Sequence, residues 1–209
     1  MYPLFETICI KNGTIQNTEW HQMRYEKSYR AYYGKPPFNN ITSDIHIPDF
    51  CQEGTFKMRI SYNETSKKVE FEKYILTDIR TLKIVEDNTI EYGLKYTDRT
   101  HLNALGKKSE RCDDILIVKN GMITDSSFCN IVFFDGFEWI TPATPLLKGS
   151  ARERLLTSGR IKEQHIRMIE INGFRSFKLI NAMRDFESIK EMDIKNIFPQ
   201  SKNCHIQPA

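Results

Sequence analysis

Three turn-forming dipeptides, each placed after a run of apolar residues, most constrain how this chain can fold. Asn12-Gly13, Asn120-Gly121 and Asp135-Gly136 follow segments rich in Ile, Val or Phe. Asn-Gly and Asp-Gly suit the tight turns of β-hairpins because both of their residues tolerate positive φ. Two segments of alternating polarity, residues 55–63 and 67–76, flank a further polar turn. The pattern predicts strands that pair with their sequence neighbours as antiparallel hairpins.

Helical signals lie between these strands. Residues 18–33 are predicted to form a helix that ends at Gly34, because glycine is favoured just beyond a helix end. Further helices are predicted at residues 98–111 and 149–159, and a short one at 172–176. Strands are predicted at residues 5–10, 14–16, 82–86, 113–118, 122–124, 166–171 and 177–181, and a hairpin at residues 130–142.

The chain has 209 residues, which is long enough for one domain or two small lobes, and its hydrophobic content of 40% can supply a core. The mixture of hairpins and helices predicts an α+β (mixed α/β) fold with two lobes. The expected division is a smaller N-terminal α/β lobe at residues 1–85 and a larger C-terminal lobe at residues 86–209.

Charge, hydropathy and cysteine content narrow the class of protein. The formal net charge of +3 is small, and acidic and basic residues are interspersed, which does not favour nucleic acid as a partner. No apolar run approaches the roughly 18 residues of a membrane span, and the N-terminus lacks the pattern of a secretory signal. Five cysteines without a CxxC pair favour a reducing compartment, so a cytoplasmic protein is predicted. Cys204-His205 would need two more ligands to bind a metal, and no metal is expected.

Lys95 is the first residue that suggests chemistry. It lies in Leu94-Lys95-Tyr96, which is predicted to be extended, so alternation would point Lys95 away from Leu94 and Tyr96. A lysine amine can form a Schiff base with an aldehyde when its site supplies a partner. Considered alone, Lys95 would be interpreted as a solvated surface lysine.

Four other positions suit an aldehyde cofactor that carries a phosphate. Asp125 follows a turn and a short strand, where a carboxylate could keep a ring nitrogen protonated. Gly149 opens a predicted helix, whose first N–H groups and dipole favour an anion. Arg24 shares a helix face with His21, three residues before it, and Asn181 ends a predicted strand. Each of these residues also has an ordinary structural interpretation as a turn, a helix start or a solvated face.

Taken in their order along the chain, these motifs resemble the class IV aminotransferases, also called fold type IV pyridoxal-phosphate enzymes. The resemblance extends from Phe5 to about Arg184. The matching segments are Phe5-Glu6-Thr7 with Asn12-Gly13, His21-Gln22-Met23-Arg24, Lys95-Tyr96-Thr97-Asp98-Arg99, Asp125 to Asn130, Thr141-Pro142, Gly149-Ser150-Ala151-Arg152 and Asn181-Ala182. The resemblance implies a two-lobed fold like that of D-amino acid aminotransferase, a homodimer, and pyridoxal 5'-phosphate as cofactor.

The same resemblance implies a role for each matching residue. Lys95 would bind the cofactor as a Schiff base and then act as the catalytic base, and Asp125 would stabilise the protonated ring nitrogen. The cofactor phosphate would be bound by residues of three segments, namely Arg24, Gly149, Ser150, Ala151, Asn181 and Ala182.

The chain departs from the family pattern at four positions. Asp125 stands where Glu is usual and is one methylene shorter. Ala151 replaces a usual Thr, and Ala182 replaces a usual Ser or Thr. Thr100 stands where aminotransferase members carry an aromatic residue.

The resemblance implies an enzyme that acts on a small, amino-substituted acid. The Lys-x-x-Asp-Arg form of the lysine motif and the small size favour 4-amino-4-deoxychorismate lyase, which releases pyruvate and 4-aminobenzoate and would serve folate biosynthesis. Two alternatives stay open. One is an aminotransferase of the branched-chain or D-amino acid type. The other is a degenerate member that binds the cofactor without turnover, which the changes at Asp125, Ala151 and Ala182 favour.

Overall fold

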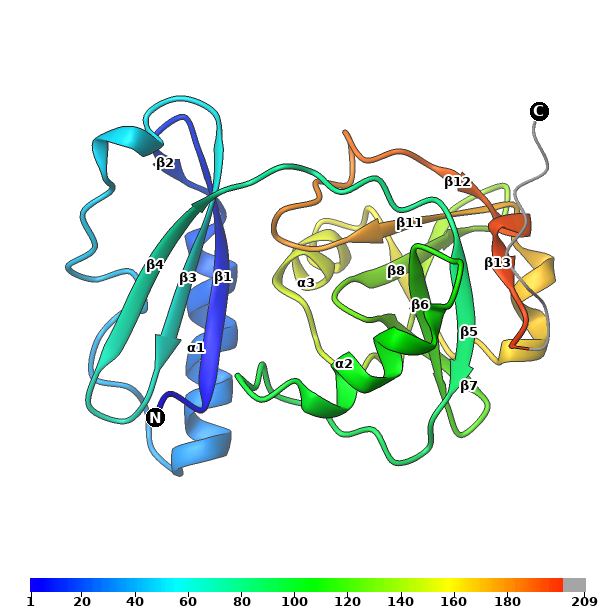
Figure 1. Cartoon of the computed structure of the whole chain (residues 1–209), viewed down its shortest axis with the longest axis horizontal. Coiled ribbons are helices and arrows are strands. Elements are labelled where there is room, and N and C mark those ends of the chain that lie inside the picture. Colours follow the sequence, from blue (N-terminus) through cyan, green and yellow to red (C-terminus); the bar gives the residue numbers. More distant parts are fainter. Residues whose placement is uncertain (201–209) are drawn as a thin grey trace. The chain divides into compact units, whose positions relative to one another are not determined.

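The strands and helices group into two units in the structure, a computed structural model that describes residues 1–200 (Figure 1). The first unit comprises Met1–Leu76 and Leu94–Asp98, and the second comprises Thr77–Gly93 and the chain from Arg99 onward. Both units combine sheet and helix, which confirms the α+β fold class. The sequence predicts Lys95 in the larger lobe, but the structure groups Leu94–Asp98 with the first unit, because this segment bonds to the first strand.

The first unit is an antiparallel sheet with a helix along one face (Figure 1). Its strands, in the order β2-β1-β3-β4, are β1 (Leu4–Lys11), β2 (Thr14–Ile15), β3 (Thr55–Tyr62) and β4 (Lys67–Lys73). Its helices are α1 (Thr18–Tyr33) and the 3₁₀ helix η1 (Asp49–Cys51). The predicted hairpins β1–β2 and β3–β4 are both confirmed.

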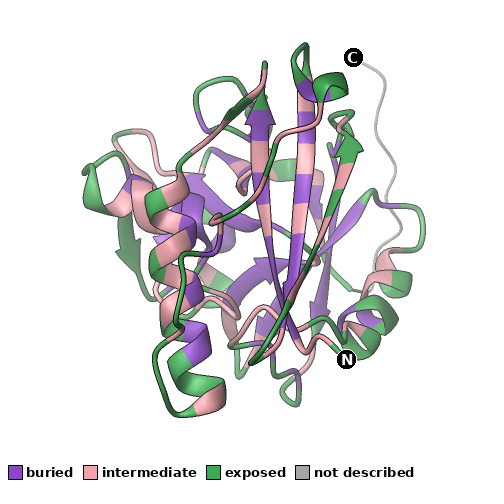
Figure 2. Cartoon of the chain, turned by 90° about the vertical axis from the view of Figure 1, so that its left-hand side faces the viewer, coloured by how far each residue is buried: buried purple, intermediate pink, exposed green. Residues whose placement is uncertain are grey.

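Helix α1 has the bounds predicted from the sequence. It ends at Gly34, whose φ of 72° is left-handed and whose N–H donates to the Arg30 carbonyl. Tyr25 and Tyr29 of α1 pack on the side chains that point to the same face of β1 and β3. These side chains are Leu4, Ile8, Ile10, Phe56, Met58, Ile60 and Tyr62. Buried and less buried residues alternate over residues 7–11 of β1 and 55–60 of β3, as expected for a sheet with one covered face, whereas residues 4–6 and 60–62 are all buried (Figure 2).

The second unit is built on one sheet, which has nine strands among the described residues. Seven of them follow the order β10-β9-β8-β7-β6-β5-β13, and β11 joins through β8 and carries β12. The strands are β5 (Leu82–Glu86), β6 (Asp114–Lys119), β7 (Met122–Ser126), β8 (Asn130–Phe134), β9 (Trp139–Pro142), β10 (Lys162–Gln164), β11 (Ser176–Ile180), β12 (Met192–Asp193) and β13 (Ile197–Phe198). The helices are α2 (Thr100–Gly106), α3 (Ser150–Thr157) and the 3₁₀ helices η2 (Lys107–Ser109), η3 (Met168–Gly173) and η4 (Ile194–Asn196).

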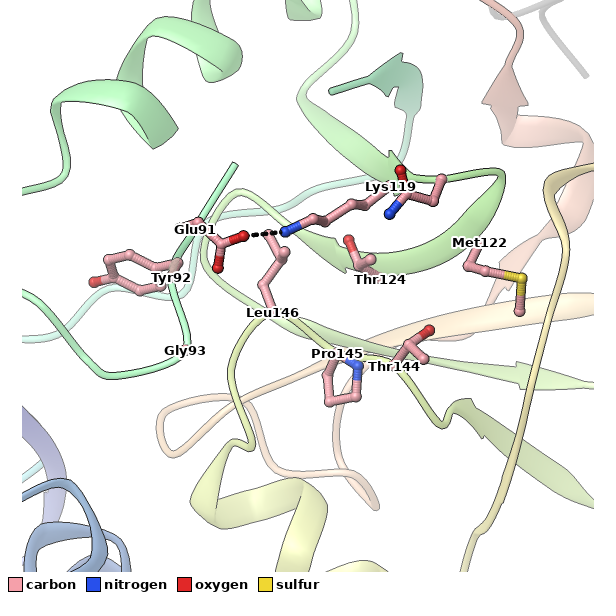
Figure 3. Close-up of a pocket in the computed structure, with 10 residues that line it drawn as sticks. Glu91, Tyr92, Gly93, Lys119, Met122, Thr124, Thr144, Pro145 and Leu146 are labelled. Carbon is pink, nitrogen blue, oxygen red and sulfur yellow. Dashed lines mark hydrogen bonds and ion pairs between the residues drawn. The ribbon is translucent and has the colours of Figure 1, made fainter. Parts of the chain in front are cut away.

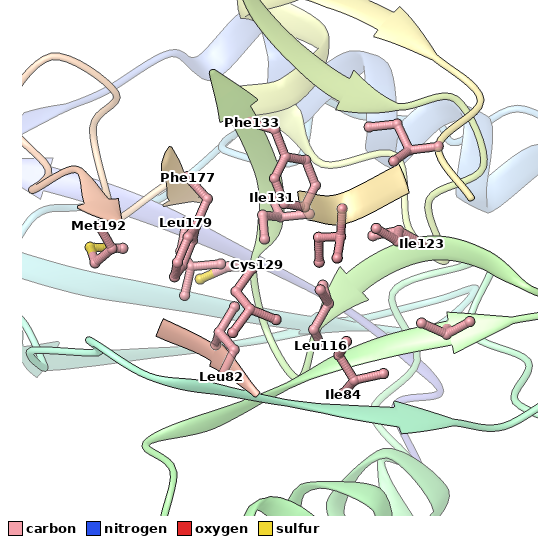
Figure 4. Packing of buried hydrophobic residues seen from close by; sticks show 14 of the residues in the cluster. Leu82, Ile84, Leu116, Ile123, Cys129, Ile131, Phe133, Phe177, Leu179 and Met192 are labelled. Carbon is pink, nitrogen blue, oxygen red and sulfur yellow. The ribbon is translucent and has the colours of Figure 1, made fainter. Parts of the chain in front are cut away.

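Strand β8 explains how the core of the second unit forms on both faces of the sheet. Ile131 and Phe133 belong to one buried cluster, where side chains from several strands meet (Figure 4). Val132, between them, belongs to a second cluster that includes Leu155 of α3. Because both faces are covered, β8 is apolar along nearly its whole length instead of alternating.

The structure corrects three predicted elements. Residues 166–171 were predicted to be a strand and 172–176 a short helix, but η3 occupies Met168–Gly173 and β11 begins at Ser176. The Glu170 side chain accepts from the Arg167 N–H at 2.8 Å, and this local contact starts a helical turn. The predicted helix at 98–111 is shorter, since α2 ends at Gly106.

Among residues 1–200, none of the helices combines the length and the apolar content that crossing a membrane requires.

Candidate functional site

Lys95 lies in the first unit, on a short segment beside β1. The Phe5 N–H donates to the Lys95 carbonyl at 3.0 Å, and Leu4 and Tyr96 form an antiparallel bridge. Leu94 and Tyr96 pack against the core of the unit. The Lys95 Nζ instead lies 4.8 Å from the centre of the Phe5 ring. The alternation predicted from the sequence is confirmed, because the ammonium group points away from the face that its apolar neighbours cover.

A second cation, which the sequence did not predict at this site, lies over the same aromatic ring. The central carbon of the Arg59 guanidinium is 3.7 Å from the centre of the Phe5 ring. Arg59 pairs across the sheet with Thr7, two residues after Phe5, so the three side chains share one face of the sheet. The alternation of residues 55–63 predicts that Arg59 lies on the face of the strand opposite to its apolar neighbours. Only the register of β3 on β1 brings Arg59 to Phe5.

The buried carboxylate of Glu6 holds Arg24 on the opposite face of this sheet. Arg24 donates from Nε to Glu6 Oε1 at 2.8 Å and from Nη2 to Glu6 Oε2 at 2.5 Å. The Glu6 side chain is 0% exposed and the Arg24 side chain 11%. His21 Nδ1 lies 2.7 Å from Glu6 Oε2. The shared helix face predicted for His21 and Arg24 is confirmed, and Glu6 is the partner that the sequence does not reveal.

Burial and charge set the protonation of this cluster. Burial by itself raises the pKa of Glu6, but the Arg24 charge and the hydrogen bonds from His21 and Arg24 outweigh it and hold the pKa at about 2. Burial lowers the pKa of His21, so its ring is neutral at pH 7 and donates the Nδ1–H to Glu6. One carboxylate, one guanidinium and a neutral imidazole leave the cluster with no net charge.

The Glu6 cluster should make the protein less stable in acid. The folded pKa of Glu6 lies below its ordinary value of 4.5, so its contribution to stability is complete above pH 4.5 and is lost as the pH falls toward 2. That contribution is expected to be about 3 kcal/mol. Urea unfolding of wild type and Glu6→Gln measures it, and the difference in free energy of unfolding should shrink with falling pH. A difference that is independent of pH would contradict this assignment.

In the second unit, Asp125 of β7 lies directly opposite Asn130 of β8. The five-residue spacing of the motif is therefore the register of a hairpin, which the Ser126 N–H closes by donating to the Cys129 carbonyl. Asn130 Nδ2 donates to Asp125 Oδ1 at 2.7 Å and to the Leu147 carbonyl at 2.8 Å. The Leu147 N–H donates to Asp125 Oδ2 at 2.9 Å. These bonds tie the carboxylate to the segment that leads into α3.

Burial raises the pKa of Asp125 to about 6, although hydrogen bonds from Leu147 and Asn130 and the charge of Arg152 act in the opposite direction. The Asp125 side chain is 5% exposed. A buried carboxyl with a raised pKa is stabilised when a cationic N–H group approaches it, because the added positive charge favours its ionised form. Asp125 is therefore suited to bind a protonated nitrogen.

Helix α3 begins at a close contact between Gly149 and Asn130. Gly149 precedes the helix in extended conformation, and a Cβ built on it would lie 2.0 Å from Asn130 Oδ1. Only glycine permits this approach without a shift of the Asn130 side chain. Ser150 and Ala151 follow and are both buried. The first N–H groups of an α-helix have no acceptor within the helix, so this end of α3 suits an anion.

Arg152, the last residue of the Gly-x-x-Arg motif, joins α3 to neighbouring strands. It is 1% exposed and donates to the Pro142 carbonyl of β9 and to Glu163 of β10, both at 2.9 Å. A third bond, to Glu153 at 2.6 Å, holds the guanidinium beside its own helix. Arg152 thus fixes the start of α3 against the sheet.

Replacing Gly149 with alanine should loosen this part of the second unit. The new methyl group must displace the Asn130 side chain, whose amide holds both Asp125 and Leu147, at a cost of about 1–3 kcal/mol. Urea unfolding measures the loss of stability. The matched control is Gly173→Ala, because a Cβ on Gly173 meets no atom within 4 Å. Equal stability of the two variants would contradict the predicted steric contact.

Asn181 follows β11 and bonds to the turn between β7 and β8. Its Nδ2 donates to Cys129 Sγ at 3.2 Å and to the Phe128 carbonyl at 3.4 Å. Its Oδ1 accepts from the Met183 N–H at 2.8 Å. The side chain of Asn181 therefore bonds both within its own loop and to the turn between β7 and β8, and it ties the loop of Asn181 and Ala182 to the hairpin that carries Asp125.

A cavity of about 400 Å³ in the second unit is lined by none of these candidate residues (Figure 3). Thr124 and Leu146 contribute to its wall, and the ion pair between Lys119 and Glu91, 2.6 Å long, lies at its edge. Thr124 and Asp125 are consecutive residues of β7, so their side chains point to opposite faces of the strand. Strand β7 therefore separates this cavity from the Asp125 carboxylate.

Residues 1–200 contain no group of three His, Cys, Asp or Glu side chains that could hold a metal ion. The Cys204-His205 pair named in the sequence analysis lies outside the described residues.

Comparisons with known proteins place the chain in a family. The family model described as "Amino-transferase class IV" matches residues 85–192. A Haemophilus influenzae protein described as uncharacterized is 45% identical over 185 residues, which cover 88% of this chain and 98% of that protein.

Solved structures give the same result. A Haemophilus somnus crystal structure, described as a candidate 4-amino-4-deoxychorismate lyase, is 35% identical with a TM-score of 0.79, and the match covers 89% of this chain and 98% of that one. A pyridoxal-phosphate-bound Mycobacterium tuberculosis structure, described as a hypothetical aminotransferase, shares the fold at 14% identity and a TM-score of 0.70, with 99% of this chain and 84% of that chain covered. The chain belongs to the class IV aminotransferase family and is a pyridoxal-phosphate-dependent enzyme.

Proposed function

We propose that this protein is a 4-amino-4-deoxychorismate lyase, which converts its substrate into pyruvate and 4-aminobenzoate. The observation that carries the proposal is the 35% identity to the Haemophilus somnus protein, which extends over 89% of this chain and 98% of that one. An aminotransferase that acts on a small amino acid is the second candidate, and the description of the matching family favours it.

The residues of both units fit pyridoxal phosphate by their chemistry. In the second unit, the buried Asp125 carboxylate suits a protonated ring nitrogen, and the start of α3 at Gly149, Ser150 and Ala151 suits a phosphate. The backbone of the loop at Asn181 and Ala182 would add to the phosphate site. In the first unit, Arg24 would contribute a guanidinium and Lys95 the amine that attaches the cofactor.

Lys95 has the central role in the proposed reaction. When bound, pyridoxal phosphate supplies a ring that withdraws electrons from the substrate carbon bearing the amino group. The amine of Lys95, released when the substrate amine takes its place, removes the proton from that carbon. The bond to the enolpyruvyl oxygen then breaks and the substrate ring becomes aromatic. The proton passes from Lys95 to the departing enolpyruvate, which becomes pyruvate. The Lys95 amine would then displace the amine of 4-aminobenzoate and so free the second product. The two products together contain every atom of the substrate, so this reaction needs no acceptor.

Arg59 is proposed to bind a carboxylate of the substrate, because its guanidinium and the Lys95 amine lie against the same Phe5 ring. Arg59→Gln should raise KM about tenfold or more and change kcat much less, since the lost contact is present before and during the reaction. Steady-state kinetics separates the two constants. The control is Lys68→Gln, which removes a cation from an exposed pair with Glu70. A fall in kcat without a change in KM would contradict this role.

The test of the lyase is release of pyruvate from aminodeoxychorismate by the purified protein, with and without a keto-acid acceptor. Pyruvate and 4-aminobenzoate formed in equal amounts without acceptor support the proposal. Turnover that requires the acceptor would establish the aminotransferase instead. If the protein binds the cofactor and neither reaction occurs, it is a degenerate member of the family.

The proposal includes a homodimer in the cytoplasm, as the family resemblance leads us to expect. Size-exclusion chromatography with light scattering measures the oligomeric state.

A further inference from the structure

We infer that Glu6 is a positioning residue that holds the Arg24 guanidinium in the orientation needed to bind the cofactor phosphate. This inference rests on the proposed function of Arg24 as a phosphate ligand. Glu6 itself would not contact the cofactor, and its effect on phosphate binding would be exerted through the Arg24 guanidinium.

The geometry of the Glu6–Arg24 pair fixes the plane of the guanidinium. The two hydrogen bonds, from Nε and Nη2 to the two carboxylate oxygens, are parallel and bidentate. A guanidinium has five N–H donors in one plane, and Glu6 uses the Nε–Nη2 edge, so the Nη1 group is directed away from the carboxylate. A bidentate pair therefore sets the direction of Nη1 as well as the position of the charge.

The carboxylate is itself held in place. His21 Nδ1 lies 2.7 Å from Glu6 Oε2, the same oxygen that accepts from Arg24 Nη2. His21 is 1% exposed and Glu6 0% exposed, so neither side chain has solvent into which to rotate. Glu6 on β1 is thus bonded to two residues of α1, and Arg24 is bound to a fixed partner.

The surroundings of Glu6 indicate that this residue has a role other than stabilising the fold. Its neighbours on the same face of β1 are Leu4, Ile8 and Ile10, all fully buried, so an aliphatic residue at position 6 would continue the core. Replacing a buried ion pair by well-packed apolar residues is often neutral or stabilising. A carboxylate in this place is better explained by the orientation that it imposes on Arg24.

Positioning and charge compensation predict opposite effects on phosphate binding. If Glu6 only offset the charge of Arg24, its removal would leave a stronger local positive charge and would tighten phosphate binding. If Glu6 positions Arg24, its removal takes the carboxylate away from a nearly buried cation, and the flexible side chain moves toward solvent. Phosphate binding then weakens.

The test compares two ligands of the full-length protein after removal of its cofactor. Pyridoxal phosphate and pyridoxal, which lacks the phosphate, are titrated into wild type, Glu6→Gln and Glu6→Asp, and absorbance reports binding. Attachment at the lysine is common to both ligands. The dissociation constant of pyridoxal divided by that of pyridoxal phosphate therefore isolates the phosphate contact, and this ratio falls when the phosphate binds more weakly. We expect both variants to reduce this ratio about tenfold, with pyridoxal affinity close to that of wild type. Glu6→Asp keeps the charge but cannot form the same bidentate pair, so it separates geometry from charge.

The controls distinguish this inference from the function on which it rests. Ile8→Val, on the same face of β1, perturbs the core and should leave the ratio unchanged. Arg24→Gln should reduce the ratio, and adding Glu6→Gln to it should cause no further loss, because Glu6 acts through Arg24. A ratio that is unchanged or increased in both Glu6 variants, while Arg24→Gln reduces it, overturns the inference and leaves the function of Arg24 intact. A ratio unaffected by Arg24→Gln overturns both.

Discussion

Replacing Lys95 with alanine should abolish covalent attachment of pyridoxal phosphate and lower turnover about 10²–10⁴-fold. The loss follows from the two proposed roles of the amine, which attaches the cofactor and then transfers a proton. Borohydride reduction followed by peptide mass mapping measures attachment, and pyruvate release measures turnover. In the wild-type protein the reduced cofactor should be found on the peptide that contains Lys95.

Lys57→Ala is a matched control for Lys95→Ala. Lys57 pairs across the sheet with Cys9, so it lies on the same face as Phe5, and it forms an ion pair with Glu72. This variant should keep both the attached cofactor and the turnover of wild type. Cofactor fixed by borohydride at another lysine in the Lys95→Ala protein, with turnover retained, would show that the site is assigned wrongly.

Replacing Asp125 with asparagine should lower kcat about 10²–10³-fold and affect KM less. The carboxylate is proposed to stabilise positive charge on the ring nitrogen, and that charge matters most as electrons move into the ring during the reaction. Asparagine keeps the shape of the side chain and removes its charge. Kinetics of pyruvate release and the visible spectrum of the bound cofactor measure the change.

Asp114→Asn is the control for Asp125→Asn. Asp114 lies in the same unit, on the adjacent strand β6, is 4% exposed, and burial raises its pKa as it does for Asp125. If loss of any buried carboxylate in this sheet disturbed the enzyme, both variants would lose activity alike. We expect Asp114→Asn to keep kcat within about threefold of wild type. Similar losses in both variants would contradict the specific role of Asp125.

Local signals in the sequence predicted the elements that depend on neighbouring residues. Helix α1 ends at Gly34 because glycine adopts the left-handed backbone there, with a φ of 72°. The hairpin that joins β8 and β9 forms at Asp135-Gly136, where Gly136 has a φ of 110°. The failure at residues 166–171 has a local cause as well, since the contact between Arg167 and Glu170 favoured a 3₁₀ turn over an extended strand.

Local signals in the sequence did not predict the short strands whose partners are distant in the chain. Strand β10 (Lys162–Gln164) pairs in parallel with β9, and β13 (Ile197–Phe198) pairs in parallel with β5. Both are short, and β10 is exposed along its length, so neither has the alternation that identifies a strand with one buried face. Their conformation depends on the strands that they meet.

The sequence by itself determined the residue types of the candidate site and the direction of several side chains. Period-two alternation is a property of any extended chain, so it placed Lys95 opposite Leu94 and Tyr96, and the five-residue interval from Asp125 to Asn130 is the register of a tight hairpin. Only the tertiary structure decided which groups act on these residues. The Glu6 carboxylate reaches Arg24 because β1 packs against α1, and Arg59 reaches Phe5 because of the register of β3 on β1. Such partners are far apart in the chain, and packing alone brings them together.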